Sequence, residues 1–281
     1  MPSFDTPEPI SVTAVVAAGS IRLTAADRFD TVVDVRPRDP KQDRDVRTAE
    51  QTEVTFAGGV LTVRTPRQRN LIGRTGTVDV TVELPAASQV EVTGSWTQVI
   101  GEGRLGEVRV KTSAGDARLE TTGPLHLTAS HGSITVDRVE GLAEITTSSG
   151  SLRVGAVDGP AVLKNSHGST SIGAVTGELR VSGANGDITV GRAGASVVAT
   201  TAHGALRVDE VARGEVQLET SYGSIEVGVR AGTAAWLDVS SGQGQVRNSL
   251  TGAGAPEQGE DTVKVRARTR YGNIDVRRAR A

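Results

Sequence analysis

The chain of 281 residues contains no cysteine and very few aromatic residues. Without cysteine there can be no disulfide framework and no thiolate metal site. Phe, Trp and Tyr together make up 2% of the residues, so a broad sandwich core filled by aromatic rings is not expected. Most apolar residues are Val, Leu, Ile and Ala, which suit a narrow core of small aliphatic side chains.

An excess of charge of one sign is also lacking. The 31 basic and 33 acidic residues give a net charge of -2, which creates no global field to attract a polyanion or an anionic membrane. No stretch approaches the roughly 18 uninterrupted apolar residues of a membrane helix, and the start, MPSFDTPEPISV, has neither the basic nor the apolar region of a secretory signal. We therefore expect a cytoplasmic protein that binds neither nucleic acid nor membrane.

Glycine, by contrast, is abundant and periodic. A short unit of turn and strand recurs in segments such as TASHGSITV, TTSSGSLRV and KNSHGSTSI. Its turn glycines are Gly115, Gly132, Gly150, Gly168, Gly186, Gly204 and Gly223, at spacings of 17, 18, 18, 18, 18 and 19 residues, with Gly242 and Gly272 as looser copies. Aliphatic residues follow two and four positions later in most copies, the spacing of one face of a β-strand.

A unit of this size cannot bury its apolar row alone, but a stack of such units can. The sequence therefore predicts an all-β fold, a single-stranded β-helix or β-solenoid with about 18 residues per coil, right-handed by the usual preference of parallel crossovers. A left-handed hexapeptide helix is excluded because the required aliphatic at every sixth residue is missing, and the glycine-rich nonapeptide of calcium-binding rolls does not occur.

The expected organisation has four parts. Residues 1–84 form irregular N-terminal strands that cap the rod, with a surface loop at 36–51; residues 85–248 form the regular repeats; residues 249–262 are a loop insertion; residues 263–281 are the final coil, which closes the rod, and a basic tail. Trp236 is expected to cover the core near this end.

The segments KTSAGDARLETT, TASHGSITV and SYGSIEV, with VELPAAS before them, resemble a bacterial β-strand-repeat family of unknown function labelled "putative adhesin", in forms familiar from actinobacteria. The resemblance extends over essentially the whole chain, from FDTPEPISV to TAAWLDVSSGQGQVRN. It implies a β-helix-like fold and no assigned enzymatic activity.

Two groups of residues are candidates for a partner surface. His131, His167 and His203 precede turn glycines at intervals of 36 residues, two coils apart. Two coils separate side chains by about 9 to 10 Å, too far for a shared metal ion, whose bonds to nitrogen are near 2.1 Å, so we expect no metal. Arg266, Arg268 and Arg270 alternate along one strand, and their face could dock an acidic partner.

No catalytic constellation is visible. Serines recur near the turns without an adjacent base, and neither paired carboxylates nor a platform of aromatic rings for sugars is expected to form. We therefore expect no enzyme and no cofactor, but a scaffold or protein-interaction rod that binds a protein partner or itself. An adhesin or glycan-binding surface protein is the first alternative, and a carbohydrate-active β-helix enzyme is the second.

Overall fold

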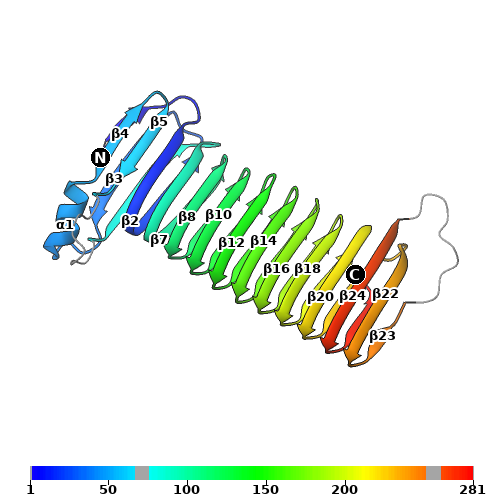
Figure 1. The fold of residues 1–281 in the computed structure, drawn as a ribbon. Helices are drawn as coiled ribbons and strands as arrows, with labels where there is room; N and C mark the ends of the chain where they lie inside the picture. Colours follow the sequence, from blue (N-terminus) through cyan, green and yellow to red (C-terminus); the bar gives the residue numbers. More distant parts are fainter. Residues whose placement is uncertain (1, 67–75, 251–260, 281) are drawn as a thin grey trace. The chain divides into compact units, whose positions relative to one another are not determined.

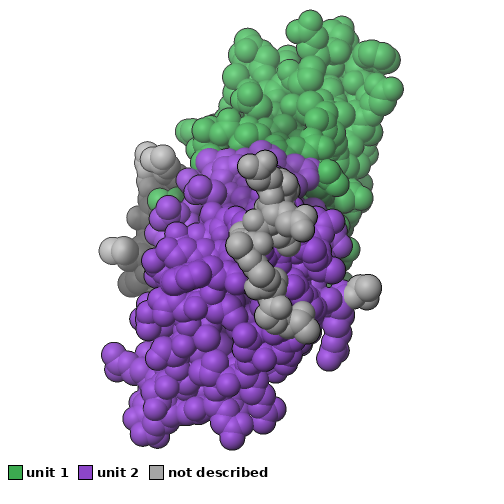
Figure 2. Space-filling model, turned by 90° about the vertical axis from the view of Figure 1, so that its right-hand side faces the viewer, with its two compact units in different colours: residues 1–140 green, residues 141–281 purple. Residues whose placement is uncertain are grey.

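The computed structural model describes residues 2–66, 76–250 and 261–280. The chain divides into two compact units, Met1–Glu140 and Gly141–Ala281 (Figure 2). Both are built from parallel strands stacked in coils, so the fold is the β-solenoid that the glycine period predicts (Figure 1). Each regular coil has two strands, one in each of two sheets, and the next coil adds its strands to the same two sheets. The right-handed course of the coils stays a prediction.

Two long strands of unit 1, β2 (Ser11–Ala26) and β7 (Gln89–Leu105), each run through both sheets, and the shorter strands β5 (Val60–Arg64) and β6 (Val78–Pro85) each pair with one half of β2. Strand β2 lies between β5 and β7 in its first half and between β6 and β7 in its second half, all parallel. Antiparallel strands flank this stack, with β3 on β6, β4 on β5 and β1 on β3. The elements are β1 (Ser3–Asp5), β2 (Ser11–Ala26), β3 (Asp30–Pro37), α1 (Asp43–Glu50), β4 (Glu53–Ala57), β5 (Val60–Arg64), β6 (Val78–Pro85), β7 (Gln89–Leu105), β8 (Val108–Ala114), β9 (Ala117–Thr122), β10 (Leu125–His131) and β11 (Ile134–Val139).

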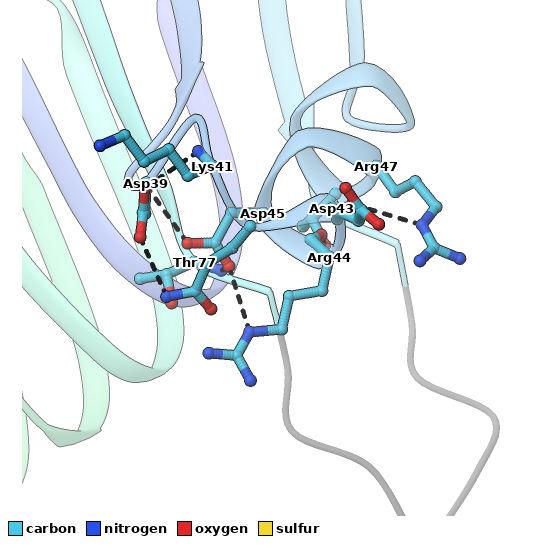
Figure 3. Close-up of polar contacts among 9 residues, drawn as sticks. Asp39, Lys41, Asp43, Arg44, Asp45, Arg47 and Thr77 are labelled. Carbon is cyan, nitrogen blue, oxygen red and sulfur yellow. Dashed lines mark hydrogen bonds and ion pairs between the residues drawn. The ribbon is translucent and has the colours of Figure 1, made fainter.

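The helix α1 corrects the prediction of a surface loop at 36–51. Acidic residues in its first turn, Asp43 and Asp45, favour a helix at this point because they face the positive end of its dipole. The Asp45 carboxylate is buried and accepts hydrogen bonds from the backbone N–H groups of Asp39 (3.3 Å) and Thr77 (3.0 Å), which ties the helix to the chain on both sides (Figure 3).

Unit 2 contains fourteen strands among its described residues. They are β12 (Ala143–Ser149), β13 (Leu152–Val157), β14 (Ala161–His167), β15 (Thr170–Val175), β16 (Leu179–Asn185), β17 (Ile188–Ala193), β18 (Val197–His203), β19 (Leu206–Val211), β20 (Gly214–Tyr222), β21 (Ile225–Val229), β22 (Ala234–Gln243), β23 (Val246–Asn248), β24 (Thr262–Tyr271) and β25 (Ile274–Arg278). In its first sheet the parallel order is β12, β14, β16, β18, β20, β24, β22. In its second sheet the order is β13, β15, β17, β19, β21, β25, β23.

The prediction that the last coil closes the rod is wrong. Strands β24 and β25 lie between the coil of β20 and β21 and the coil of β22 and β23, and they pair with both in parallel. The segment that connects them to β23 was predicted as a loop insertion at 249–262, and most of it, 251–260, lies outside the described residues. The predicted part boundaries at 84 and 262 stay predictions.

The core is thin and aliphatic, as the shortage of aromatic residues predicts. Inward positions such as Leu163 and Val265 are completely buried, and no aromatic side chain of the described chain belongs to the buried core. Since facing sheets pack about 10 Å apart, one layer of Val, Leu and Ile from each sheet fills the space. Trp236 was expected to cover this core, but it points outward and is 55% exposed.

Stacked corners join the two strands of each coil. The predicted corner glycines Gly115, Gly132, Gly150, Gly168, Gly186, Gly204, Gly223 and Gly272 all have a φ between 128° and 158°. In the coil of β22 and β23 the corner residue is Gly244 rather than Gly242, because Gly244 has the positive φ and lies against the carbonyl oxygen of Gly272.

A buried polar row lies beside these corners and was not foreseen. Asn165, Thr220 and Thr269 point inward and donate hydrogen bonds to the carbonyl oxygens of Gly150, Gly204 and Gly223, at 3.0, 3.1 and 3.0 Å. These three corner carbonyls are thereby paired, which avoids the cost of an unsatisfied buried acceptor.

Candidate functional site

The corner of unit 2 carries the predicted histidines in one column. The residue before each corner glycine lies beside its equivalent in the next coil, in the order Ser149, His167, Asn185, His203, Tyr222, Tyr271 and Gln243. Asn185 separates His167 from His203, and the Nδ1 atom of His167 lies 3.3 Å from the carbonyl oxygen of Ser148. His131 occupies the same position in unit 1, next to Ala114.

Three rings of this column form a stack. The His203 and Tyr222 rings are 4.9 Å apart with an interplanar angle of 2°, and the Tyr222 and Tyr271 rings are 4.8 Å apart with an angle of 3°. Tyr222 is 50% exposed and Tyr271 is 44% exposed. We call His203, Tyr222 and Tyr271 the corner stack. It contradicts the expectation that the aromatic residues do not cluster.

Sequence reasoning missed this stack because 48 residues and a complete coil separate Tyr222 from Tyr271 along the chain. The two tyrosines become neighbours only because β24 pairs with β20. A signal was present in the sequence, since both residues precede a glycine in SYGSIEV and RYGNIDV, but the strand order was needed to read it.

A groove of about 550 Å³ lies next to the corner stack, on the outer face of β20, β24 and β22. Its lining includes Glu219, Ser221, Arg268, Arg270, Tyr271 and Gln243. Gly242 also lines it, and a side chain at this position would meet the carbonyl oxygen of Arg270. We call this depression the corner groove.

The predicted basic face is largely neutralised within the chain. Arg266 forms an ion pair with Glu215 at 3.0 Å, and Arg268 forms one with Asp238 at 2.9 Å. The ammonium nitrogen of Lys264 lies 5.1 Å from the centre of the Trp236 ring, a cation–π distance. Arg270 differs from these residues because it has no ion pair with any residue that the structure describes.

The carboxylates next to the corners have structural partners. Asp116 Oδ1 accepts a hydrogen bond from the backbone N–H of Ser133, and Asp187 Oδ1 accepts one from that of Ala205, both at 2.8 Å. Each carboxylate thus pairs with the next coil. Within the described ranges, no three His, Asp or Glu side chains gather as a group that could hold a metal ion, and no helix there is both long and apolar enough to span a bilayer.

Among known proteins, one family matches most of the chain. The family model Toastrack DUF4097 matches residues 16–277, and no curated protein matches the chain. A "putative cell adhesion protein" from Clostridium sporogenes is 10% identical, with 99% of this chain and 98% of that one covered and a TM-score of 0.26.

Two further solved structures are similar at the same low level. A "putative adhesin" from Parabacteroides merdae is 14% identical, with 80% of this chain and 93% of that one covered and a TM-score of 0.40. A "putative lipid binding protein" from Parabacteroides distasonis is 11% identical, with 99% and 96% covered and a TM-score of 0.31. The family match covers far more than half of the chain, and the chain belongs to the Toastrack DUF4097 family, a β-solenoid family of unknown function.

Proposed function

We propose that this chain is a non-catalytic interaction module that binds an acidic segment of a protein partner at the corner stack and the corner groove. The observation that carries the proposal is the exposed tyrosine pair beside Arg270. Tyr and Arg are among the residue types that dominate binding energy at protein interfaces, and here Tyr271 and Arg270 line one groove while Tyr222 stacks on Tyr271 beside it.

Arg270 is the group of the groove that favours an acidic residue of the partner, while the groove as a whole, with Glu219 in its lining and Arg268 paired with Asp238, carries no excess of positive charge. Arg268 is balanced by Asp238, whereas Arg270 has no ion-pair partner among the described residues. A carboxylate of the partner placed against Arg270 would form a charge-assisted, bidentate pair. The edges of Tyr222 and Tyr271 add hydroxyl groups and apolar area next to it.

The stacking geometry leaves no face of Tyr222 for a sugar ring, which weakens the glycan-binding alternative at this residue. Sugar rings pack against the faces of aromatic rings, but in the corner stack the two faces of Tyr222 lie against His203 and Tyr271. Trp236, the other exposed ring of this region, has Lys264 over one face. A protein segment, which can use ring edges and hydroxyl groups, suits the surface better.

The test is comparative cross-linking in the native cell, followed by mass spectrometry, with the full chain and three variants. Arg270→Glu and Tyr271→Ala alter the groove, while Phe29→Ala removes an aromatic side chain that is 71% exposed in unit 1. We expect a partner whose capture falls at least fivefold in both groove variants and is unchanged in Phe29→Ala.

Equal capture by all four proteins would overturn the proposal. If the captured partner is a second copy of this chain, analytical ultracentrifugation of the same variants tests whether the groove binds it. Self-association through the groove should weaken in Arg270→Glu and Tyr271→Ala but not in Phe29→Ala. Cell fractionation tests the accompanying proposal that the interaction takes place in the cytoplasm.

A further inference from the structure

The second sheet of unit 2 carries a cluster of arginines that the corner groove does not include. Arg207 and Asp209 point outward from β19, and Arg277 points outward from β25. Gly228 of β21 lies between them, paired with Arg277. Because Gly228 has no side chain, Arg277 can extend across β21 toward β19.

Arg277 is held in place with few partners of its own. Its side chain is only 19% exposed, yet its Nη2 atom lies 4.0 Å from Asp209, at the limit of an ion pair. Its Nη1 atom donates to the carbonyl oxygen of Arg278 at 3.3 Å. The Asp209 oxygen already accepts a hydrogen bond from Arg207 Nε at 2.6 Å. One carboxylate therefore serves two guanidinium groups, and the one on Arg277 keeps donors to spare.

These side chains line a pocket of about 310 Å³. Four arginines, Arg192, Arg207, Arg277 and Arg280, and two acidic residues, Asp209 and Glu210, contribute to it, which gives a formal charge of +2. The nearest ion-pair partners outside the lining are Arg230 (to Glu210, 3.6 Å) and Glu226 (to Arg207, 3.7 Å), and they cancel each other. The lining residues and these two neighbours together therefore carry an excess of two positive charges.

From this geometry we propose that the pocket is a binding site for a doubly charged oxyanion, the phosphate group of a phosphate monoester or inorganic phosphate. A dianion matches the excess charge, and planar guanidinium groups offer paired N–H donors that fit phosphate oxygens. The volume is at the small end of the roughly 300 to 1,000 Å³ of small-molecule sites, so the group bound inside is small.

The rest of a monoester has a place to lie. Gly191 lines the pocket, and Gly173 and Gly155 follow it in the neighbouring strands β15 and β13, each glycine close to the carbonyl oxygen of the one before. This row leaves backbone without side chains beside the pocket. The site lies on the sheet opposite the corner groove and does not depend on the function proposed for that groove.

The experiment is a calorimetric titration of the full chain with inorganic phosphate at pH 7.5, with acetate at equal ionic strength as the monovalent control. We expect phosphate to bind at least tenfold more tightly than acetate. Arg277→Gln should weaken phosphate binding by about tenfold, the cost of one charged hydrogen bond. Arg280→Gln, an exposed residue beyond the last strand, cannot unfold the chain and should weaken binding by a factor of about three.

Arg153→Gln is the matched control, because Arg153 is an exposed arginine on the same sheet outside the pocket. A second arm replaces free phosphate by phosphatidylcholine vesicles with and without phosphatidic acid, which presents the same group on a lipid. Binding that is weakened by about these factors in the two pocket variants and unchanged in Arg153→Gln supports the site. The arm in which binding occurs shows whether the phosphate group is free or carried by a lipid. Absence of binding in both arms, or equal losses in all three variants, overturns the proposal.

Discussion

Replacing a single corner glycine tests the stacking of the coils most directly. Gly186 has a φ of 141°, and a Cβ atom at this position would meet the carbonyl oxygen of Gly168 in the preceding coil at well under 3.0 Å, closer than real Cβ atoms approach other atoms. The obstacle is backbone, which cannot rotate away as a side chain can. Alanine at residue 186 must therefore both adopt an unfavourable φ and push two coils apart.

The expected cost of Gly186→Ala follows from these two effects. A positive φ costs an L-residue about 1 to 2 kcal/mol. Separation of these two coils weakens the two backbone hydrogen bonds that join them at the corner, Gly168 N–H to the Asn185 carbonyl and Thr170 N–H to the Asp187 carbonyl, both 2.9 Å long. Each is worth about 1 kcal/mol, so the free energy of unfolding should fall by about 3 to 4 kcal/mol.

Gly232 provides the matched control. Its φ is also positive, at 77°, but nothing lies within 4 Å of the position where a Cβ would be. Gly232→Ala should therefore cost only the conformational part, about 1 to 2 kcal/mol. Urea denaturation followed by circular dichroism measures both variants. If the two midpoints fall by the same amount at unchanged slope, the close approach between coils does not constrain the corner, and the reasoning is refuted.

Three further predictions concern single polar contacts. Asp187→Ala removes the acceptor for the Ala205 amide and should lower the free energy of unfolding by about 1 kcal/mol in the same urea experiment. Thr220→Val keeps the shape of the side chain and removes the hydroxyl that donates to the carbonyl of Gly204, so the free energy of unfolding should fall by about 1 kcal/mol. An unchanged free energy of unfolding would show that this hydrogen bond does not stabilise the fold. The hydrogen bond from Arg28 lowers the pKa of Asp30 below its ordinary value. The pair therefore contributes fully to stability at any pH above the ordinary pKa of an aspartate, and this contribution disappears as the pH falls through the lowered pKa of the folded state. An NMR titration of Arg28→Gln should show the pKa of Asp30 rising, and an unchanged titration would contradict the assignment.

The solenoid itself could be predicted because its physical cause recurs in the sequence. Every coil must turn at the same place, and the corner conformation requires glycine, so a period near 18 residues appears in the chain. The same reasoning gives the thin aliphatic core. The helix at Asp43–Glu50 was missed because it occurs once and its stability depends on Asp45, whose partners, Asp39 and Thr77, include one that is 32 residues away.

The place of the last coil could not be predicted from the period, because a repeat defines what a coil is and not which coils are neighbours. All of its inward residues, such as Val265 and Ala267, would fit any level of the stack. Gly244 and Gly272 are equivalent corners, and their order in space is the reverse of their order in the chain. The corner stack is a consequence of that reversal, so it was invisible for the same reason.

Charge offers the physical reason why β24 lies between β20 and β22. Strand β24 is basic, with Lys264, Arg266, Arg268 and Arg270. Its neighbour β20 carries Glu215 and Glu219, and its other neighbour, β22, carries Asp238. In sequential order β24 would be outermost, with acidic residues on one side only, and one of the ion pairs to Glu215 and Asp238 would be lost. Opposite-charge neighbours across strands contribute about 0.2 to 1 kcal/mol each, small against the whole fold but enough to choose between two orders that bury the same apolar row. The same strand order brings Tyr222 against Tyr271 and places Arg270 in the groove between β20 and β22, so the candidate binding surface depends on the position of β24.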